Sequence, residues 1–200
     1  MPFTIRFSIW AGVCVCFPLL AATREPWVNQ RLIGSPEAPP PFVAGRAFPK
    51  LEVKHPVAME LEPDGTHILL LQNFAWEQKR STLKRFAARA DATEAETLLE
   101  LPEPAYSIGL HPKYAENGWL YLGSNGPGAE GKLHSRIVRY TVDRQPPHRI
   151  VEGSALTIIE WPSAGHNGAA IAFGNDGMLY VTSGDGTGLS DLDNVGQDLS

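Results

Sequence analysis

Short apolar runs, separated by polar turn-forming residues, recur along the chain from about residue 51 onward. The runs are rich in Val, Ile, Leu, Tyr and Trp, and clusters of Gly, Pro, Asn and Asp end them, which is typical of β-strands. The segment 87–96, rich in Ala and Glu, is also compatible with a short helix. The pattern predicts strands at residues 57–61, 67–72, 82–87, 96–101, 106–110, 119–124, 136–142, 155–161, 168–173 and 178–183.

Tight turns repeat at a regular distance between these predicted strands. Asp64-Gly65, Asn117-Gly118 and Asp176-Gly177 suit hairpins, because both residues of each turn tolerate positive φ. The turn glycines are 53 and 59 residues apart, so each unit holds four strands. Four strands at this period are typical of a β-propeller blade. We therefore expect an all-β protein of the β-propeller class, with residues 51–200 covering about two and a half blades.

The number of predicted blades bears on whether the propeller is complete. Propellers close with about 4–8 blades, and closure protects the edges of their sheets. We therefore expect these residues to be the N-terminal part of a longer protein. The alternative is a complete open sandwich of about ten strands.

The first residues have the pattern of an export signal. Arg6 is followed by an uncharged apolar run at 7–20 and by small residues at 21–23, which together predict a signal peptide at 1–22. The run is shorter than the roughly 20 residues of a membrane span, so we expect no stable span, with an uncleaved N-terminal anchor as the alternative. Residues 23–50 form a Pro-rich lead-in to the predicted propeller at 51–200. We therefore expect a periplasmic or secreted protein.

Composition and charge exclude several classes of protein. Hydrophobic residues make up 43% of the chain, which is enough for a core and argues against disorder. The 17 Lys and Arg against 22 Asp and Glu leave a net charge of −5, which argues against a nucleic-acid partner. Both cysteines, Cys14 and Cys16, lie in the predicted signal peptide. The mature chain therefore has no cysteine to ligate a metal.

One histidine and one aspartate flank the last predicted hairpin symmetrically. His166 and Asp185 lie at equal distances on either side of its turn, so pairing of the two strands would bring the side chains together. The other units do not repeat the pair: Lys54 and Glu103 stand in place of the histidine, and Asn73 and Gly126 in place of the aspartate. One interpretation is a general base whose tautomer a carboxylate sets. The alternative is a loop histidine that only hydrogen-bonds its neighbour.

The segments around this pair carry a family resemblance. They resemble the glucose/sorbosone dehydrogenase family, whose soluble members include sugar dehydrogenases that use pyrroloquinoline quinone. One departure is Ala169, where the family usually has glycine. The resemblance rests on GHNGAAIAFGNDGMLYVTSGDG at 165–186, followed by Asn194 and Gln197-Asp198, and on YSIGLHP at 106–112 and NGWLY at 117–121.

The resemblance implies a six-bladed propeller that binds pyrroloquinoline quinone and calcium on one face. In that family His166 matches the catalytic base and Asp185 the carboxylate that orients it, while the ligands of calcium and quinone lie in later blades. The implied activity is oxidation of a sugar or polyol, with electrons passing to an acceptor such as a cytochrome c. The alternative is a non-catalytic extracellular propeller that binds a protein or a glycan.

Overall fold

Antiparallel strands follow one another through the computed structural model, which describes residues 44–74, 78–188, 190–192 and 194–196. The predicted signal peptide and most of the Pro-rich lead-in lie outside the described residues. The described residues from Arg46 onward belong to one compact unit. None of the helices in this part of the chain is long and apolar enough to cross a membrane.

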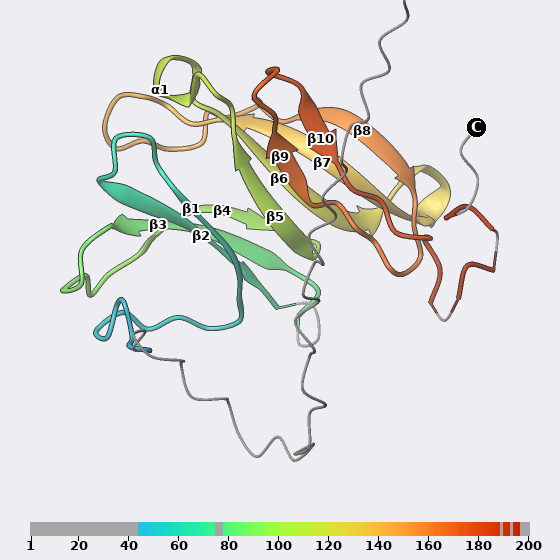
Figure 1. The fold of residues 1–200 in the computed structure, drawn as a ribbon, viewed down its shortest axis with the longest axis horizontal. Helices are drawn as coiled ribbons and strands as arrows, with labels where there is room; N and C mark the ends of the chain where they lie inside the picture. The colour runs from blue at the N-terminus through green and yellow to red at the C-terminus, as the bar shows by residue number, and fades with distance from the viewer. Residues whose placement is uncertain (1–43, 75–77, 189, 193, 197–200) are drawn as a thin grey trace, which may run out of the picture. The chain divides into compact units, whose positions relative to one another are not determined.

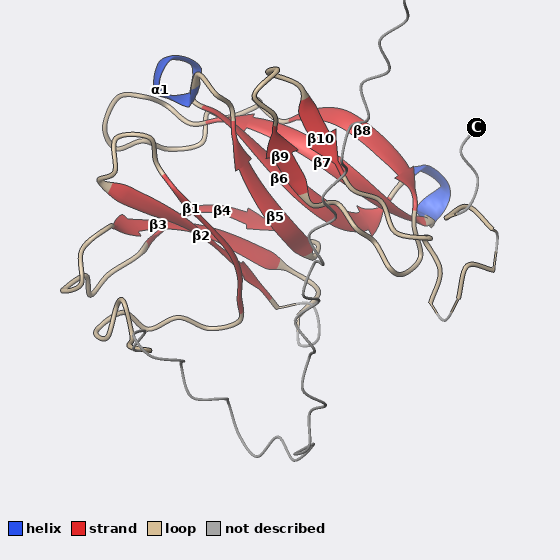
Figure 2. Ribbon diagram, in the orientation of Figure 1, coloured by secondary structure: helices blue, strands red, loops and turns tan. Residues whose placement is uncertain are grey.

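Two four-stranded meanders and a further hairpin make up the described fold (Figures 1 and 2). We call the two meanders blade 1 and blade 2, because each is an antiparallel sheet of four sequential strands, as in a propeller. Blade 1 consists of β1 (Pro56–Leu61), β2 (His67–Asn73), β3 (Ser81–Ala87) and β4 (Glu96–Leu101). Blade 2 consists of β5 (Ala105–Leu110), β6 (Trp119–Pro127), β7 (Leu133–Thr141) and β8 (Leu156–Pro162). The separate hairpin that follows consists of β9 (Ile171–Phe173) and β10 (Leu179–Val181).

The all-β prediction is confirmed, with local differences. Residues 88–95 form a turn and irregular backbone, so the helix considered there is wrong. The chain instead forms one helical turn in the loop between β5 and β6 (α1, Tyr114–Asn117) and a short 3-10 helix (Ala129–Gly131). Gly118 closes α1 at φ 65°, where a Cβ atom would overlap the carbonyl oxygen of Val142. The packing of α1 against the following strands therefore requires a glycine at this position.

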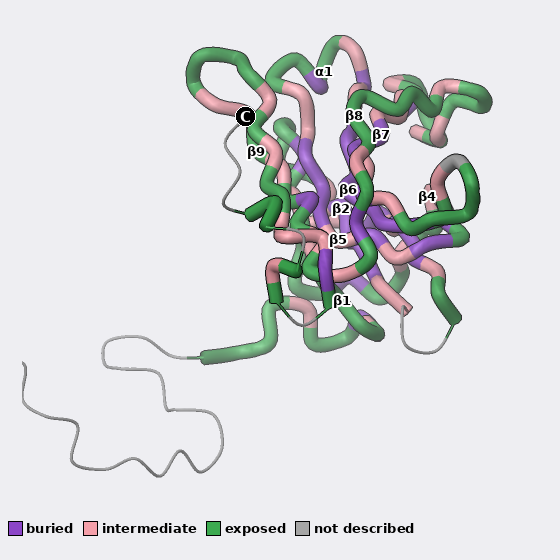
Figure 3. Tube along the Cα trace, turned by 90° about the vertical axis from the view of Figure 1, so that its right-hand side faces the viewer, coloured by how far each residue is buried: buried purple, intermediate pink, exposed green. Residues whose placement is uncertain are grey.

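Both faces of the central strands are buried, which explains their nearly continuous apolar sequences. In β6, Leu120 and Leu122 face a core shared with Leu69 and Leu71 of blade 1. Tyr121 lies between them in sequence and points to the opposite face, where it packs toward the β9–β10 hairpin. In Figure 3 the buried stretches concentrate in the middle of the sheets.

An ion pair is buried between the two blades. Glu62, in the turn after β1, is 1% exposed and accepts hydrogen bonds from Arg85 Nε at 2.8 Å and Nη2 at 2.9 Å. The Tyr114 hydroxyl of α1 donates to the same carboxylate at 3.4 Å. Burial, and then the nearby Glu62, raise the pKa of Tyr114, so it remains a neutral donor. The turn of blade 1 is thereby tied to the loop of blade 2.

Candidate active site

The structure brings His166 and Asp185 together, as their spacing predicts. The Nδ1 atom of His166 lies 3.0 Å from Oδ1 and 3.2 Å from Oδ2 of Asp185. The imidazole is 51% exposed, whereas the carboxylate is 20% exposed. The aspartate of the pair is therefore largely enclosed by the protein, whereas the histidine is open to solvent.

A loop, rather than the expected regular strand, places His166. The predicted strand 168–173 begins only at Ile171, and the predicted strand 178–183 is reduced to β10. Regular pairing would set His166 opposite residue 186, because Ala172 pairs with Tyr180. Instead the backbone turns at positive φ at His166 and at Ala169, which departs from extended geometry. This turn directs the imidazole to Asp185.

The two sides of the hairpin approach closely where the pair is formed. A Cβ atom on Gly184 would overlap the carbonyl oxygen of His166. Any side chain at residue 184 would therefore push the loop that carries the histidine away from the strand that carries the aspartate.

Thr187 holds the carboxylate of Asp185 in place. Its backbone N–H donates to Oδ1 at 2.9 Å and its hydroxyl donates at 3.2 Å. The backbone N–H of Thr187, and then the imidazole of His166, lower the pKa of Asp185. An ionised carboxylate only accepts hydrogen bonds, so a neutral imidazole donates from Nδ1 and keeps its lone pair on Nε2. The geometry therefore fits a base whose Nε2 atom accepts a proton.

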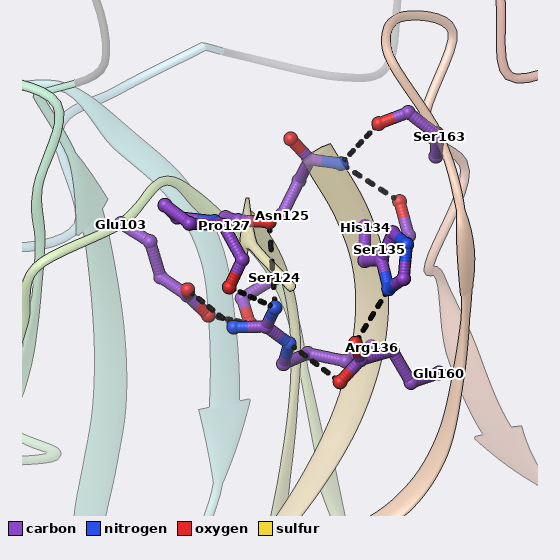
Figure 4. A network of polar contacts seen from close by, with 10 residues as sticks. Glu103, Ser124, Asn125, Pro127, His134, Ser135, Arg136, Glu160 and Ser163 are labelled. Carbon is purple, nitrogen blue, oxygen red and sulfur yellow. Dashed lines mark hydrogen bonds and ion pairs between the residues drawn. The ribbon is translucent and has the colours of Figure 1, made fainter. Parts of the chain in front are cut away.

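The equivalent junction between blade 1 and blade 2 contains a different set of partners. Glu103, which stands in the place of His166, accepts a hydrogen bond from Ser124 at 2.5 Å and from Arg136 at 2.7 Å. Arg136 also donates to the Pro127 carbonyl at 2.8 Å, and Glu160 continues the network (Figure 4). Glu103 and Arg136 satisfy each other in a largely buried ion pair, so this junction joins elements rather than offering an open base.

An open cavity of about 530 Å³ lies beside the aspartate. The residues described in the structure contain no group of three or more His, Cys, Asp or Glu placed to hold a metal ion. Of the residues that follow the hairpin in the family resemblance, Asn194 is described, and Gln197-Asp198 lies outside the described residues. The cavity is lined by Trp161, Pro162, Ser183, Gly184, Asp185, Gly186, Val195 and Gly196.

A repeated Asn–Ser pair escaped the sequence analysis. Asn73 faces Ser81 across β2 and β3, and Asn125 faces Ser135 across β6 and β7. Each pair binds the connection that follows its blade, since Asn73 donates to the Ala105 carbonyl and Asn125 to a carbonyl of the loop before β9. The signal was present in the sequence as an asparagine directly after one predicted strand and a serine directly before the next.

Comparison with known proteins extends these observations to a family. The family model described as glucose/sorbosone dehydrogenase matches residues 53–200. The structure of the PQQ-bound aldose sugar dehydrogenase from Streptomyces coelicolor is 25% identical, with a TM-score of 0.52 over 68% of this chain and 40% of that chain. The apo-form of the soluble aldose sugar dehydrogenase from Escherichia coli is 18% identical, with a TM-score of 0.52 over 66% of this chain and 38% of that chain. These β-propellers confirm the predicted fold class.

The chain is also similar, over a shorter stretch, to a protein that is not named as a dehydrogenase. Hedgehog-interacting protein from Mus musculus is 34% identical over 87 residues, which is 40% of this chain and 12% of that protein. The same protein from Homo sapiens matches over the same extent. This chain therefore spans about 40% of the length of the solved sugar dehydrogenases and about an eighth of these curated relatives.

Proposed function

Because the chain belongs to the glucose/sorbosone dehydrogenase family, we propose that the protein is an exported, quinone-dependent dehydrogenase that oxidises a sugar or a related alcohol. The observation that carries this proposal is the contact of His166 Nδ1 with the Asp185 carboxylate at 3.0 Å. A carboxylate on Nδ1 leaves Nε2 of this half-exposed ring as the proton acceptor, and oxidation of a hydroxyl-bearing carbon needs such a base.

In the proposed reaction His166 removes the proton from the substrate hydroxyl. The O–H bond breaks, its proton moves to Nε2, and a carbonyl forms as the C–H bond yields a hydride. Asp185 stabilises the positive charge that then develops on the ring, and Thr187 keeps the carboxylate in position for this. When bound, pyrroloquinoline quinone supplies the acceptor for the hydride.

The described residues fit such a quinone in one respect. They offer a half-exposed imidazole whose Nδ1 side is occupied, and hence a base beside open space. We propose that quinone contacts and a calcium site lie beyond the described residues, as the family resemblance implies, and we assign calcium no role in the proton transfer. We also propose export through the segment 1–22, and an external acceptor such as a cytochrome c for the electrons.

The experiment that tests this function is turnover by the full-length protein. The protein is reconstituted with pyrroloquinoline quinone and calcium, and a panel of aldoses and polyols is assayed by reduction of an artificial electron acceptor. Substrate-dependent reduction that requires the quinone supports the proposal. A folded protein that binds the quinone and oxidises none of these substrates would contradict it.

The match to Hedgehog-interacting protein favours a second candidate, a non-catalytic extracellular propeller that binds a protein or a glycan. The name of that relative describes an interaction rather than a reaction. Binding of pyrroloquinoline quinone by isothermal titration calorimetry separates the two candidates, because a propeller that only binds a protein or a glycan needs no redox cofactor. Failure to bind the quinone together with the lack of turnover would favour this second candidate.

A further inference from the structure

Hydrogen bonds from side chains of blade 2 hold the loop that carries His166 on both sides of the histidine. Before it, the Ser163 carbonyl accepts a hydrogen bond from Asn125 Nδ2 at 2.9 Å. After it, the Asn167 carbonyl accepts a hydrogen bond from the Ser135 hydroxyl at 3.2 Å. Asn125 also donates to the Ser135 hydroxyl at 3.2 Å, so the two anchors form one unit, which Figure 4 shows facing Ser163.

Hydrogen bonds within the loop and between the loop and β5 reinforce these anchors. The Asn167 side chain donates to the Tyr106 hydroxyl at 3.0 Å and accepts from the Ser163 hydroxyl at 2.9 Å. Ser107 donates to the Ala169 carbonyl at 2.5 Å. The backbone therefore has fixed points before and after His166, although it departs from regular strand geometry there.

Burial makes the two principal anchors effective. Asn125 is 6% exposed, Ser135 is fully buried and Ser163 is 3% exposed, so water has little access to the Ser163 carbonyl that Asn125 bonds. A buried carbonyl that loses its donor cannot readily regain one from solvent, and the loop must then move to satisfy it. A movement at Ser163 or Asn167 is transmitted directly to the residues between them.

The same device in blade 1 provides an internal comparison. Asn73 Nδ2 donates to the Ala105 carbonyl at 2.9 Å, and the Ala105 N–H donates to the Ser81 hydroxyl at 2.7 Å. The connection held there contains Glu103, which binds Ser124 and Arg136, instead of a histidine. The Asn–Ser pair is therefore a general device that joins a blade to the next connection, and only in blade 2 does that connection carry His166.

We propose that Asn125 and Ser135 are positioning residues for His166. They hold the loop so that Nδ1 reaches the Asp185 carboxylate and Nε2 is presented to the open side. The effect on turnover rests on the proposed function, whereas the effect on the imidazole does not. Displacement of a catalytic group by about 1 Å can lower a rate by about 100-fold, so small movements of this loop matter.

The test compares Asn125→Ala with Asn73→Ala in the full-length protein, because both remove one asparagine of the same device. Ser135→Ala and Ser81→Ala form a second, milder pair in case the first pair folds poorly. The first readout is kcat and KM. The second is the ¹⁵N spectrum of ring-labelled histidine at about pH 8, where an ordinary imidazole is neutral. The His166 signals are assigned by their loss in His166→Gln.

We expect similar falls in Tm for Asn125→Ala and Asn73→Ala. Only Asn125→Ala should lower kcat, by about 10- to 100-fold with a smaller change in KM. Its His166 signals should move from the Nδ1-protonated form toward a mixture of tautomers, as in Asp185→Asn. Unchanged His166 signals in Asn125→Ala and Ser135→Ala would overturn the proposal. If the parent protein has no turnover, the proposed function fails, and the spectra alone still decide the inference.

Discussion

Replacing Glu62 by Gln should destabilise the protein far more than loss of a comparable charge at the surface. Glu62 is 1% exposed and accepts two hydrogen bonds from Arg85, whose side chain is 9% exposed. Removing one partner leaves the other charge buried without compensation, which costs about 3–5 kcal/mol. Because glutamine keeps one acceptor oxygen, we expect about 3 kcal/mol, or roughly two powers of ten in the folding equilibrium constant.

The measurement is urea unfolding of the full-length protein, followed by tryptophan fluorescence. The matched control is Asp91→Asn, which breaks the pair with Arg89 at 3.2 Å, where the side chains are 70% and 65% exposed. An exposed pair of this kind contributes about 0–1 kcal/mol. Equal destabilisation by Glu62→Gln and Asp91→Asn would refute the reasoning. Combining Glu62→Gln with Arg85→Met should cost less than the sum of the two single changes, because no unpaired charge then remains.

The remaining predictions concern the candidate active site. His166→Ala should lower kcat by about 10²- to 10⁴-fold while quinone binding, measured by calorimetry, survives; turnover close to that of the parent would end the assignment. Asp185→Asn should cost less, because an amide still bonds the ring but allows the wrong tautomer. Gly184→Ala should lower kcat by displacing His166, whereas Gly188→Ala, where a Cβ atom meets open space, should leave it unchanged. Because Thr187 and His166 lower the pKa of Asp185, the stability it contributes is complete above its ordinary value of 3.8 and is lost as the pH falls below it. The difference in urea midpoint between the parent and Asp185→Asn should therefore be present at about pH 5 and shrink in stronger acid.

The sequence by itself determined the strands, the turns and the neighbourhood of the site. Strands such as β2 and β6 can be predicted from the sequence because both of their faces are buried, which gives apolar runs that end at turn residues. The family resemblance and the spacing of His166 and Asp185 were also present in the sequence. These features are local, or depend on simple pairing within one hairpin, and a pattern of residues records them directly.

Only the tertiary structure decided how the site is held. β9 begins later than predicted because the loop with His166 bonds to side chains of blade 2, such as Asn125 and Tyr106, that are distant in sequence. The pairing of Arg136 with Glu103, which stands in the place of His166, likewise depends on strands that meet only after packing. Side-chain bonds between distant residues leave no periodic signal, because any polar residue at a strand end could form them. Their partners follow from the way in which one blade packs against the next connection.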